Sequence, residues 1–145
     1  MRWLMMCVFA TFTALPDRPA PVMPVKPPEV NDLVKLDGLW AVVSYEFDGG
    51  RLPEDQVAAY PKLIIKDGTY RWTSGANANT MKLDATKTPK LVDYTLSGQI
   101  YPGIYELNGD IFRDCIAPPG RERPMDFTVP RGSGRMYFVY RRVKD

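Results

Sequence analysis

The 145-residue sequence contains no histidine and only two cysteines, Cys7 and Cys115. Without histidine, no imidazole can activate a serine or cysteine nucleophile, and the commonest protein ligand of catalytic zinc is missing. Two cysteines are too few for a cysteine-only zinc site or for a framework of disulfides. The sequence therefore indicates no metal site, no cofactor and no catalytic residues, and we expect a protein that is not an enzyme.

The sequence also has little excess charge of either sign. Its 19 basic and 17 acidic residues give a net charge of +2, which by itself does not indicate a polyanionic partner. The C-terminal third is nevertheless rich in arginine with aromatic residues in between, a pattern typical of nucleic-acid surfaces. A solvated strand edge with an arginine stacked on a tryptophan gives the same pattern. We favour that interpretation and expect no nucleic-acid partner. The arginines are Arg121, Arg123, Arg131, Arg135, Arg141 and Arg142.

The apolar run at positions 3–15 is too short to cross a bilayer as a helix, which requires about 20 residues. It follows Arg2, an arrangement typical of a signal peptide; the alternative is an apolar tail without a targeting role. Six prolines between positions 16 and 31 indicate an extended linker. We expect a signal-peptide-like segment at 1–15, a proline-rich linker at 16–32 and one domain at 33–145. The protein would then be secreted or held in the periplasm or cell envelope, without an integral membrane span.

The rest of the chain is a series of short apolar runs separated by turn residues such as Asp48-Gly49 and Asp67-Gly68. Eight runs have the length of strands, and the one helix candidate is 53–59, where Pro53 is followed by acidic residues. Strands at this short, regular spacing predict an all-β, eight-stranded antiparallel up-and-down barrel with one short helix. The expected strands are 41–47, 62–66, 69–73, 80–84, 91–96, 103–107, 111–116 and 135–143.

A hairpin between the sixth and seventh expected strands is indicated by Asn108-Gly109, a pair that type I′ turns favour. Closure of the hairpin by these two residues places Tyr105 opposite Phe112 and Leu107 opposite Asp110. Side chains alternate along each strand, so one face of the hairpin is largely apolar. The residues on that face are Tyr105, Leu107, Phe112, Asp114 and Ile116.

Asp114 is the polar exception on this face and is our candidate ligand-binding residue. If the face is the barrel interior, the carboxylate needs a partner such as an arginine or a tyrosine hydroxyl, because an isolated buried charge is costly. Such an anchor could hold the head group of a ligand. The alternative is that Asp114 lies at the solvated rim without a functional role. We favour the rim, because Pro118 ends the strand four residues later.

Three motifs carry a resemblance to a known family. They are G-I-Y-E-L-x-G-D at 103–110, C-x-A-x-P-G-x-x-R-P-x-x-F at 115–127, and G-S-G at 132–134 before an apolar strand. With this spacing the chain resembles, from about position 36 to 142, a lipocalin-like (calycin-type) domain family that is abundant in planctomycete bacteria and has no assigned activity. The matching positions, which we expect to be structural, are Gly38, Trp40, Tyr105, Gly109, Asp110, Cys115, Pro119, Gly120, Arg123, Pro124, Phe127 and Arg142.

The resemblance also implies a specific contact at one end of the barrel. Gly38-x-Trp40 is similar to the G-x-W that begins the first strand of lipocalins, where an arginine of the last strand lies across the tryptophan. A guanidinium over an indole face is favourable, and both groups bury apolar surface there. We expect this arginine to be Arg142, with Arg141 as the alternative.

Function follows less directly than fold. An eight-stranded barrel is either filled by its own side chains or holds one small ligand. We expect a non-enzymatic binding protein, with a small apolar ligand in the barrel or a macromolecular partner at the loops. The first alternative is a structural or interaction module with a filled barrel, and the second is an enzyme on a lipocalin-like fold. The sequence leaves the oligomeric state open, and we expect Cys115 to be a buried structural thiol.

Overall fold

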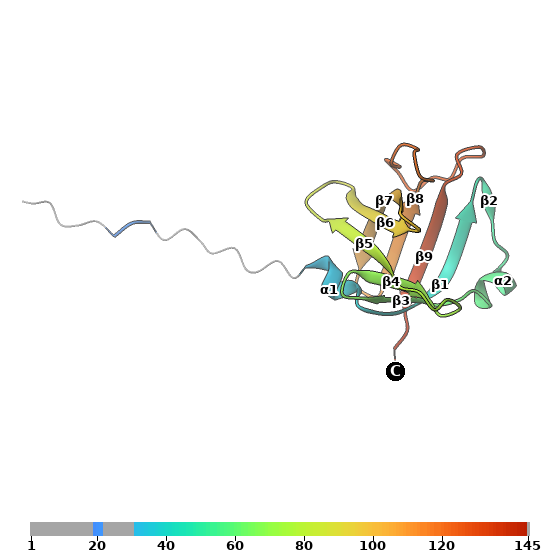
Figure 1. The fold of residues 1–145 in the computed structure, drawn as a ribbon, viewed down its shortest axis with the longest axis horizontal. Helices are drawn as coiled ribbons and strands as arrows, with labels where there is room; N and C mark the ends of the chain where they lie inside the picture. Colours follow the sequence, from blue (N-terminus) through green and yellow to red (C-terminus); the bar gives the residue numbers. More distant parts are fainter. Residues whose placement is uncertain (1–18, 22–30, 145) are drawn as a thin grey trace, which may run out of the picture.

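The computed structural model describes residues 19–21 and 31–144, so the signal-peptide-like segment and most of the linker lie outside the described residues. Figure 1 shows a sheet that curls into a barrel, with two short helices at its periphery. The helices are α1 (Asp32–Leu36) and α2 (Glu54–Ala58). The strands are β1 (Gly38–Phe47), β2 (Gly50–Arg51), β3 (Leu63–Lys66), β4 (Thr69–Trp72), β5 (Asn79–Asp84), β6 (Lys90–Leu96), β7 (Gln99–Asn108), β8 (Ile111–Ile116) and β9 (Met136–Arg142).

Eight of the strands form a closed barrel. From β3 to β9 each strand pairs with the next, and β1 pairs with both β3 and β9, so no barrel strand keeps a free edge. All of these pairings are antiparallel, and the strands follow one another in chain order. The two-residue β2 pairs only with the end of β1 and takes no part in closure. The expected eight-stranded antiparallel up-and-down barrel is confirmed.

Tight turns set the strand register as the sequence indicates. Asp48-Gly49, Asp67-Gly68 and Ser97-Gly98 each have positive φ at both residues, as a type I′ turn requires. This turn matches the right-handed twist of the strands that it joins. The first two pairs are visible in the sequence as Asp-Gly, and the third has serine in the position where aspartate or asparagine is more usual.

The β7–β8 hairpin departs from its expected register. Leu107 pairs with Phe112 rather than with Asp110, and every expected pair in the hairpin is displaced by two residues. The physical reason is that Asn108 remains extended and pairs in the strand, whereas only Gly109 has positive φ. Gly109 and Asp110 therefore form the loop, with glycine at the first central position as in a type II′ turn. A shift of two preserves the alternation of side chains, so the expected common face is retained.

Helix α1 is a feature that the sequence does not predict. The Asn31 side chain caps it by accepting a hydrogen bond from the backbone N–H of Leu33 at 3.1 Å. At its C-terminal end, Leu36 is fully buried against the barrel core. Asp32, one residue before the expected start of the domain, is buried as well. The helix therefore covers one end of the barrel, which we call the closed end.

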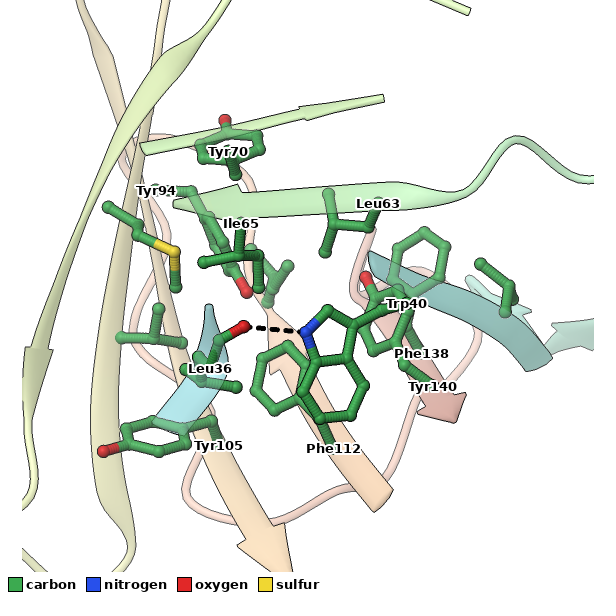
Figure 2. Packing of buried hydrophobic residues seen from close by; sticks show 14 of the residues in the cluster. Leu36, Trp40, Leu63, Ile65, Tyr70, Tyr94, Tyr105, Phe112, Phe138 and Tyr140 are labelled. Carbon is green, nitrogen blue, oxygen red and sulfur yellow. Dashed lines mark hydrogen bonds between the residues drawn. The ribbon is translucent and has the colours of Figure 1, made fainter. Parts of the chain in front are cut away.

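Trp40 and Arg142 meet at the closed end, as expected. The indole is fully buried, and its Nε1–H donates to the carbonyl oxygen of Leu36 at 2.8 Å (Figure 2). The Arg142 guanidinium lies 4.3 Å from the centre of the Trp40 ring and donates to the carbonyl of Asp37 at 2.8 Å. The choice of Arg142 is confirmed, and the alternative, Arg141, is exposed. These contacts join the first strand, the last strand and α1 in one layer.

The loop at 117–135 is fastened to the outer wall of the barrel by Arg123. Its guanidinium donates to the carbonyls of Val92 and Gly103 at 3.0 and 2.7 Å and forms an ion pair with Asp93 at 2.7 Å. The neighbouring Pro124 is fully buried. Charged hydrogen bonds of this kind are stronger than neutral ones, so Arg123 holds the loop against β6 and β7.

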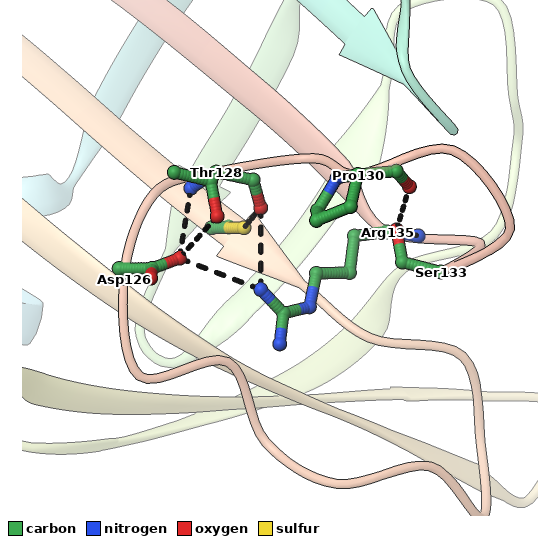
Figure 3. Close-up of polar contacts among 6 residues, drawn as sticks. Asp126, Thr128, Pro130, Ser133 and Arg135 are labelled. Carbon is green, nitrogen blue, oxygen red and sulfur yellow. Dashed lines mark hydrogen bonds and ion pairs between the residues drawn. The ribbon is translucent and has the colours of Figure 1, made fainter.

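The second half of the same loop contains its own polar contacts (Figure 3). Asp126 accepts from the backbone N–H and the hydroxyl of Thr128 at 3.1 and 2.5 Å, and Arg135 donates to the Thr128 carbonyl at 3.3 Å. The Ser133 hydroxyl donates to the carbonyl of Pro130 at 2.5 Å. The G-S-G motif is therefore part of a turn that leads into β9.

Candidate functional site

The barrel interior is filled at the closed end and hollow at the other. A cavity of about 220 Å³ lies between the ends of the strands farthest from α1. It extends to the surface beside Leu96, which is 41% exposed at the β6–β7 turn. We call this the open end. The sequence left open whether side chains fill the barrel or leave room for a ligand. In the structure, side chains fill the half at the closed end, and the other half contains a cavity.

Aromatic rings form most of the cavity wall. Tyr45 of β1 stacks on Phe138 of β9 with ring centres 4.3 Å apart. Tyr60, just before β3, meets Trp72 of β4 edge-on at 5.4 Å and also contacts Phe138 at 6.0 Å. These offset and edge-on arrangements are the favourable ones for aromatic pairs. The rings of the wall therefore pack against one another even where they are only partly buried.

Tyrosine is the dominant residue type around the cavity. Six of the eight tyrosines in the sequence line it. Each supplies a flat ring and a hydroxyl, and burial raises the pKa of Tyr70 to about 12, so that hydroxyl stays neutral. Among the described residues, no charged side chain lines the cavity. The lining residues are Tyr45, Tyr60, Leu63, Tyr70, Trp72, Asn79, Tyr94, Leu96, Tyr101, Ile116, Met136, Phe138 and Tyr140.

Asp114 lies in the layer directly beneath the cavity. It is fully buried, and in the ladder it pairs with Tyr105 on one side and with the cavity residue Phe138 on the other. Its Oδ2 accepts a hydrogen bond of 2.5 Å from the hydroxyl of Tyr94, another cavity residue. The expectation that Asp114 lies at the solvated rim is wrong. Pro118 does end the pairing, but Ile116, on the same face as Asp114, is only 7% exposed and lines the cavity, so the strand stays covered beyond Asp114.

The Asp114 carboxyl is also short of partners. Among the described residues, its Oδ1 is the buried side-chain polar atom that has no hydrogen-bond partner, and no cation contacts the group. Burial raises the pKa of Asp114 to about 7, although the hydrogen bond from Tyr94 acts in the opposite direction. A carboxyl in this state changes its charge near neutral pH. An acid with a free buried oxygen next to a cavity is a candidate for contact with a ligand.

Asp32, a second buried carboxylate, lies at the closed end and, unlike Asp114, has hydrogen-bond donors at both of its oxygens. Asp32 accepts hydrogen bonds from Lys90 and from the Tyr105 hydroxyl, both at 2.8 Å, and from Lys35 at 3.3 Å. Burial raises the pKa of Asp32, but the donors outweigh it and hold that pKa below its usual value. This cluster ties α1 to β6 and β7. It is satisfied within the fold, so we assign it to stability.

The motif residues of the family resemblance are placed around the scaffold rather than around the cavity. Gly38 lies against Arg142 at the closed end, and Asp110 pairs there with Lys144 at 2.7 Å. The Phe127 ring lies 4.0 Å from the guanidinium of Arg113 on the outer wall. Tyr105 and Gly109 belong to the β7–β8 hairpin, whereas Cys115, Pro119, Gly120, Arg123 and Pro124 lie in or beside the loop at 117–135.

Cys115 is buried and free, as expected of a structural thiol. Its Sγ lies 3.7 Å from the carbonyl of Thr128, beneath the loop at 117–135. Burial raises the pKa of the thiol to about 11, so the nucleophilic thiolate is nearly absent at neutral pH. Cys115 therefore gives no sign of catalytic use.

The cavity tyrosines are the feature that sequence reasoning missed. Tyr94, Phe138 and Tyr140 all occupy inward positions of strands that alternate, so an inventory of inward aromatic residues would have found them. Tyr101 shares the inward parity of Tyr105 but lies outside the expected strand 103–107, and Tyr60 carried no such signal. Tyr60 lies outside any strand, and whether an inward ring fills the barrel or lines a cavity depends on packing across all eight strands.

Comparisons of the chain with protein-family models, with curated proteins and with solved structures found no match. The architecture itself, an eight-stranded antiparallel barrel, is compatible with a calycin-like fold. Neither helix in the described part of the chain has the length and apolar character needed to span a bilayer. In the same part, His, Cys, Asp and Glu side chains do not gather in groups of three that could hold a metal ion.

Proposed function

We propose that this protein is a non-enzymatic binding protein that holds one small, mainly apolar organic molecule in the open half of its barrel. The observation that carries the proposal is the aromatic cavity of about 220 Å³. An apolar protein cavity of about 150 Å³ is enough to bind benzene. The volume therefore suits a ligand of one ring or a short branched chain.

The chemistry of the wall supports binding rather than catalysis. Small-molecule sites are mostly apolar and aromatic, with a few polar groups that orient the ligand. Here the polar groups are tyrosine hydroxyls and the Asn79 amide. A hydrolytic or acyl-transfer site needs a nucleophile with a base, or two cooperating acids. Asp114 is the buried carboxyl beside this cavity, and among the described residues no second acid contributes to its pKa.

We infer membership of the lipocalin-like family from the three motifs and from the stacking of Arg142 on Trp40 at 4.3 Å. A macromolecular partner at the loops is a weaker alternative. Phe47 and Ile100 are exposed near the open end, but nothing in the structure selects a partner for them.

Binding can be tested with indole as a neutral aromatic probe, monitored by NMR shifts of the cavity residues. We expect indole to bind the protein, and Met136→Trp to weaken it at least tenfold, because the larger side chain fills the cavity that Met136 lines. Met125→Trp is the matched control: Met125 is 77% exposed, and this variant should bind as the parent does.

Folding of the variants is checked by circular dichroism before binding is compared. If Met136→Trp does not fold, Leu96→Trp at the cavity mouth tests the same point, since Leu96 is already partly exposed. Absence of indole binding, or equal binding by the cavity-filled and control variants, would rule out the proposed site.

We further propose that the protein acts outside the cytoplasm, on the basis of the apolar run at positions 3–15 after Arg2. Fractionation of the native host with N-terminal sequencing is the measurement. We expect a mature chain without the first residues in the envelope or medium. A cytoplasmic protein that still carries Arg2 would contradict this location.

A further inference from the structure

The charge of the ligand can be inferred from groups that surround the cavity. Among the described residues, the lining contains neither lysine nor arginine, although basic residues make up 19 of the 145 in the sequence. The lining consists instead of aromatic rings, six of them from tyrosine, together with aliphatic side chains and Asn79. The faces of aromatic rings carry partial negative charge, and they attract cations.

The layer beneath the cavity adds a carboxyl group, which is negatively charged when it is ionised. Asp114 is fully buried there; Tyr94 donates to one carboxyl oxygen, and the other has no partner in the described part of the chain. The comparison with Asp32 is informative, because that carboxylate contacts two lysines and a tyrosine hydroxyl. The fold can thus supply cations to a buried acid, but among the described residues no cation contacts Asp114.

We propose that the cavity selects a small organic cation, a quaternary or tertiary ammonium on a short apolar group, over neutral and anionic molecules of the same shape. This inference rests on the proposed function, since it requires that the cavity binds a ligand at all. The ammonium would lie among the tyrosine rings above Tyr94, and its charge would be balanced by the carboxylate of Asp114 one layer below.

An alkylated ammonium suits this site better than a primary amine. Its charge is spread over methyl groups, so it is weakly hydrated, and aromatic cages recognise such groups through cation–π contact. A ligand with a carboxylate group would be disfavoured. Its carboxylate would lose its hydration, would have no lysine or arginine among the described lining residues to pair with, and would lie close to the like charge of Asp114.

Three probes of nearly equal shape test the inference: choline, its neutral isostere 3,3-dimethylbutan-1-ol, and 3,3-dimethylbutanoate. Their affinities are measured by NMR titration of the full-length protein at pH 8, where Asp114 is mainly ionised. We expect choline to bind at least tenfold more tightly than the alcohol, and the carboxylate to bind more weakly than either.

Asp114→Asn then tests the source of the preference. We expect this variant to lose at least fivefold of the choline affinity and to change the affinity for the alcohol less than twofold, because the side-chain shape is kept and the charge removed. Asp110→Asn is the matched control. Asp110 is an acid at the closed end, in contact with Lys144, and its replacement should leave the choline preference intact.

The outcomes separate the two proposals. If the alcohol or the carboxylate binds as tightly as choline, or if none of the three binds while indole does, the charge selection is wrong and the binding function stands. If indole also fails to bind, both are wrong. Should Asp114→Asn not fold, the comparison of the three probes on the parent protein still decides the inference.

Discussion

Replacing Trp40 with alanine should lower the free energy of unfolding by about 3–5 kcal/mol, the usual cost of emptying a large aromatic core site. Trp40 is fully buried, contacts Phe112 edge-on at 5.8 Å and lies under the Arg142 guanidinium. The substitution also removes the donor to the Leu36 carbonyl, and an orphaned buried acceptor costs about 1–3 kcal/mol. Since small domains are stable by about 5–15 kcal/mol, much of the margin would be lost. Urea unfolding followed by circular dichroism measures the change.

Two further variants identify where the Trp40 effect originates. Trp40→Phe keeps an aromatic ring but loses the indole donor, so its cost should be intermediate. Trp72→Ala removes the same kind of side chain from the partly exposed cavity wall and should cost much less than Trp40→Ala. A loss below about 1 kcal/mol in Trp40→Ala would show that the closed end does not depend on this layer.

The barrel and its closed end could be predicted because turn residues and the alternation of side chains can be read from short stretches of the sequence. The pair Asp67-Gly68 predicts a type I′ turn because of its residue types, and the alternation of side chains along each strand predicts which residues point inward. The pairing of Trp40 with Arg142 was predictable from the resemblance together with the parity of the last strand.

Features that depend on distant residues were not predictable. Helix α1 has only five residues, so no period is visible, and it is stabilised by contacts of Leu36 and Asp32 with strands far along the chain. In the β7–β8 hairpin, Asn108 and Gly109 allow two loop placements, and packing of the whole barrel decides between them. Because the register is displaced by two residues, the predicted residue pairs were wrong, but the prediction of which side chains share a face was right.

The burial of Asp114 at the candidate site could not be predicted from the sequence either. The expected face was right, yet the nearby Pro118 suggested a rim position. Proline stops strand pairing, but it says nothing about burial, and here Ile116 lies beyond Asp114 on the same face and is only 7% exposed. The cavity above depends on how six tyrosines from different segments meet, which no single stretch encodes.

That buried carboxyl should make the protein less stable as the pH rises from 5 to 8. The pKa of Asp114 is raised from 3.8 to about 7 by burial, so the folded state binds a proton that the unfolded state has already released. Stability is therefore greatest below the unfolded pKa, falls as the pH rises towards 7, and is level above it. At about 1.4 kcal/mol per pH unit, we expect a loss of about 3 kcal/mol between pH 5 and 8.

Between pH 5 and 8, the change in stability can be assigned to Asp114 because few other side chains titrate in this range. Among the described residues, the titratable groups beside Asp114 are Tyr94, Tyr105, Tyr140 and Cys115, and burial raises the pKa of each above its usual value, away from the window. Because the sequence contains no histidine, no side chain with an ordinary pKa between 5 and 8 competes with the effect.

Urea unfolding of the parent and of Asp114→Asn at several pH values between 5 and 8 measures the loss. The asparagine variant should show a nearly level profile, since the titrating group is gone. Asp110→Asn should keep the full decline, because contact with Lys144 lowers the pKa of Asp110 and its titration ends below pH 5. A level profile in the parent, or the same decline in Asp114→Asn, would mean that Asp114 ionises without cost and that its surroundings are more polar than the structure shows.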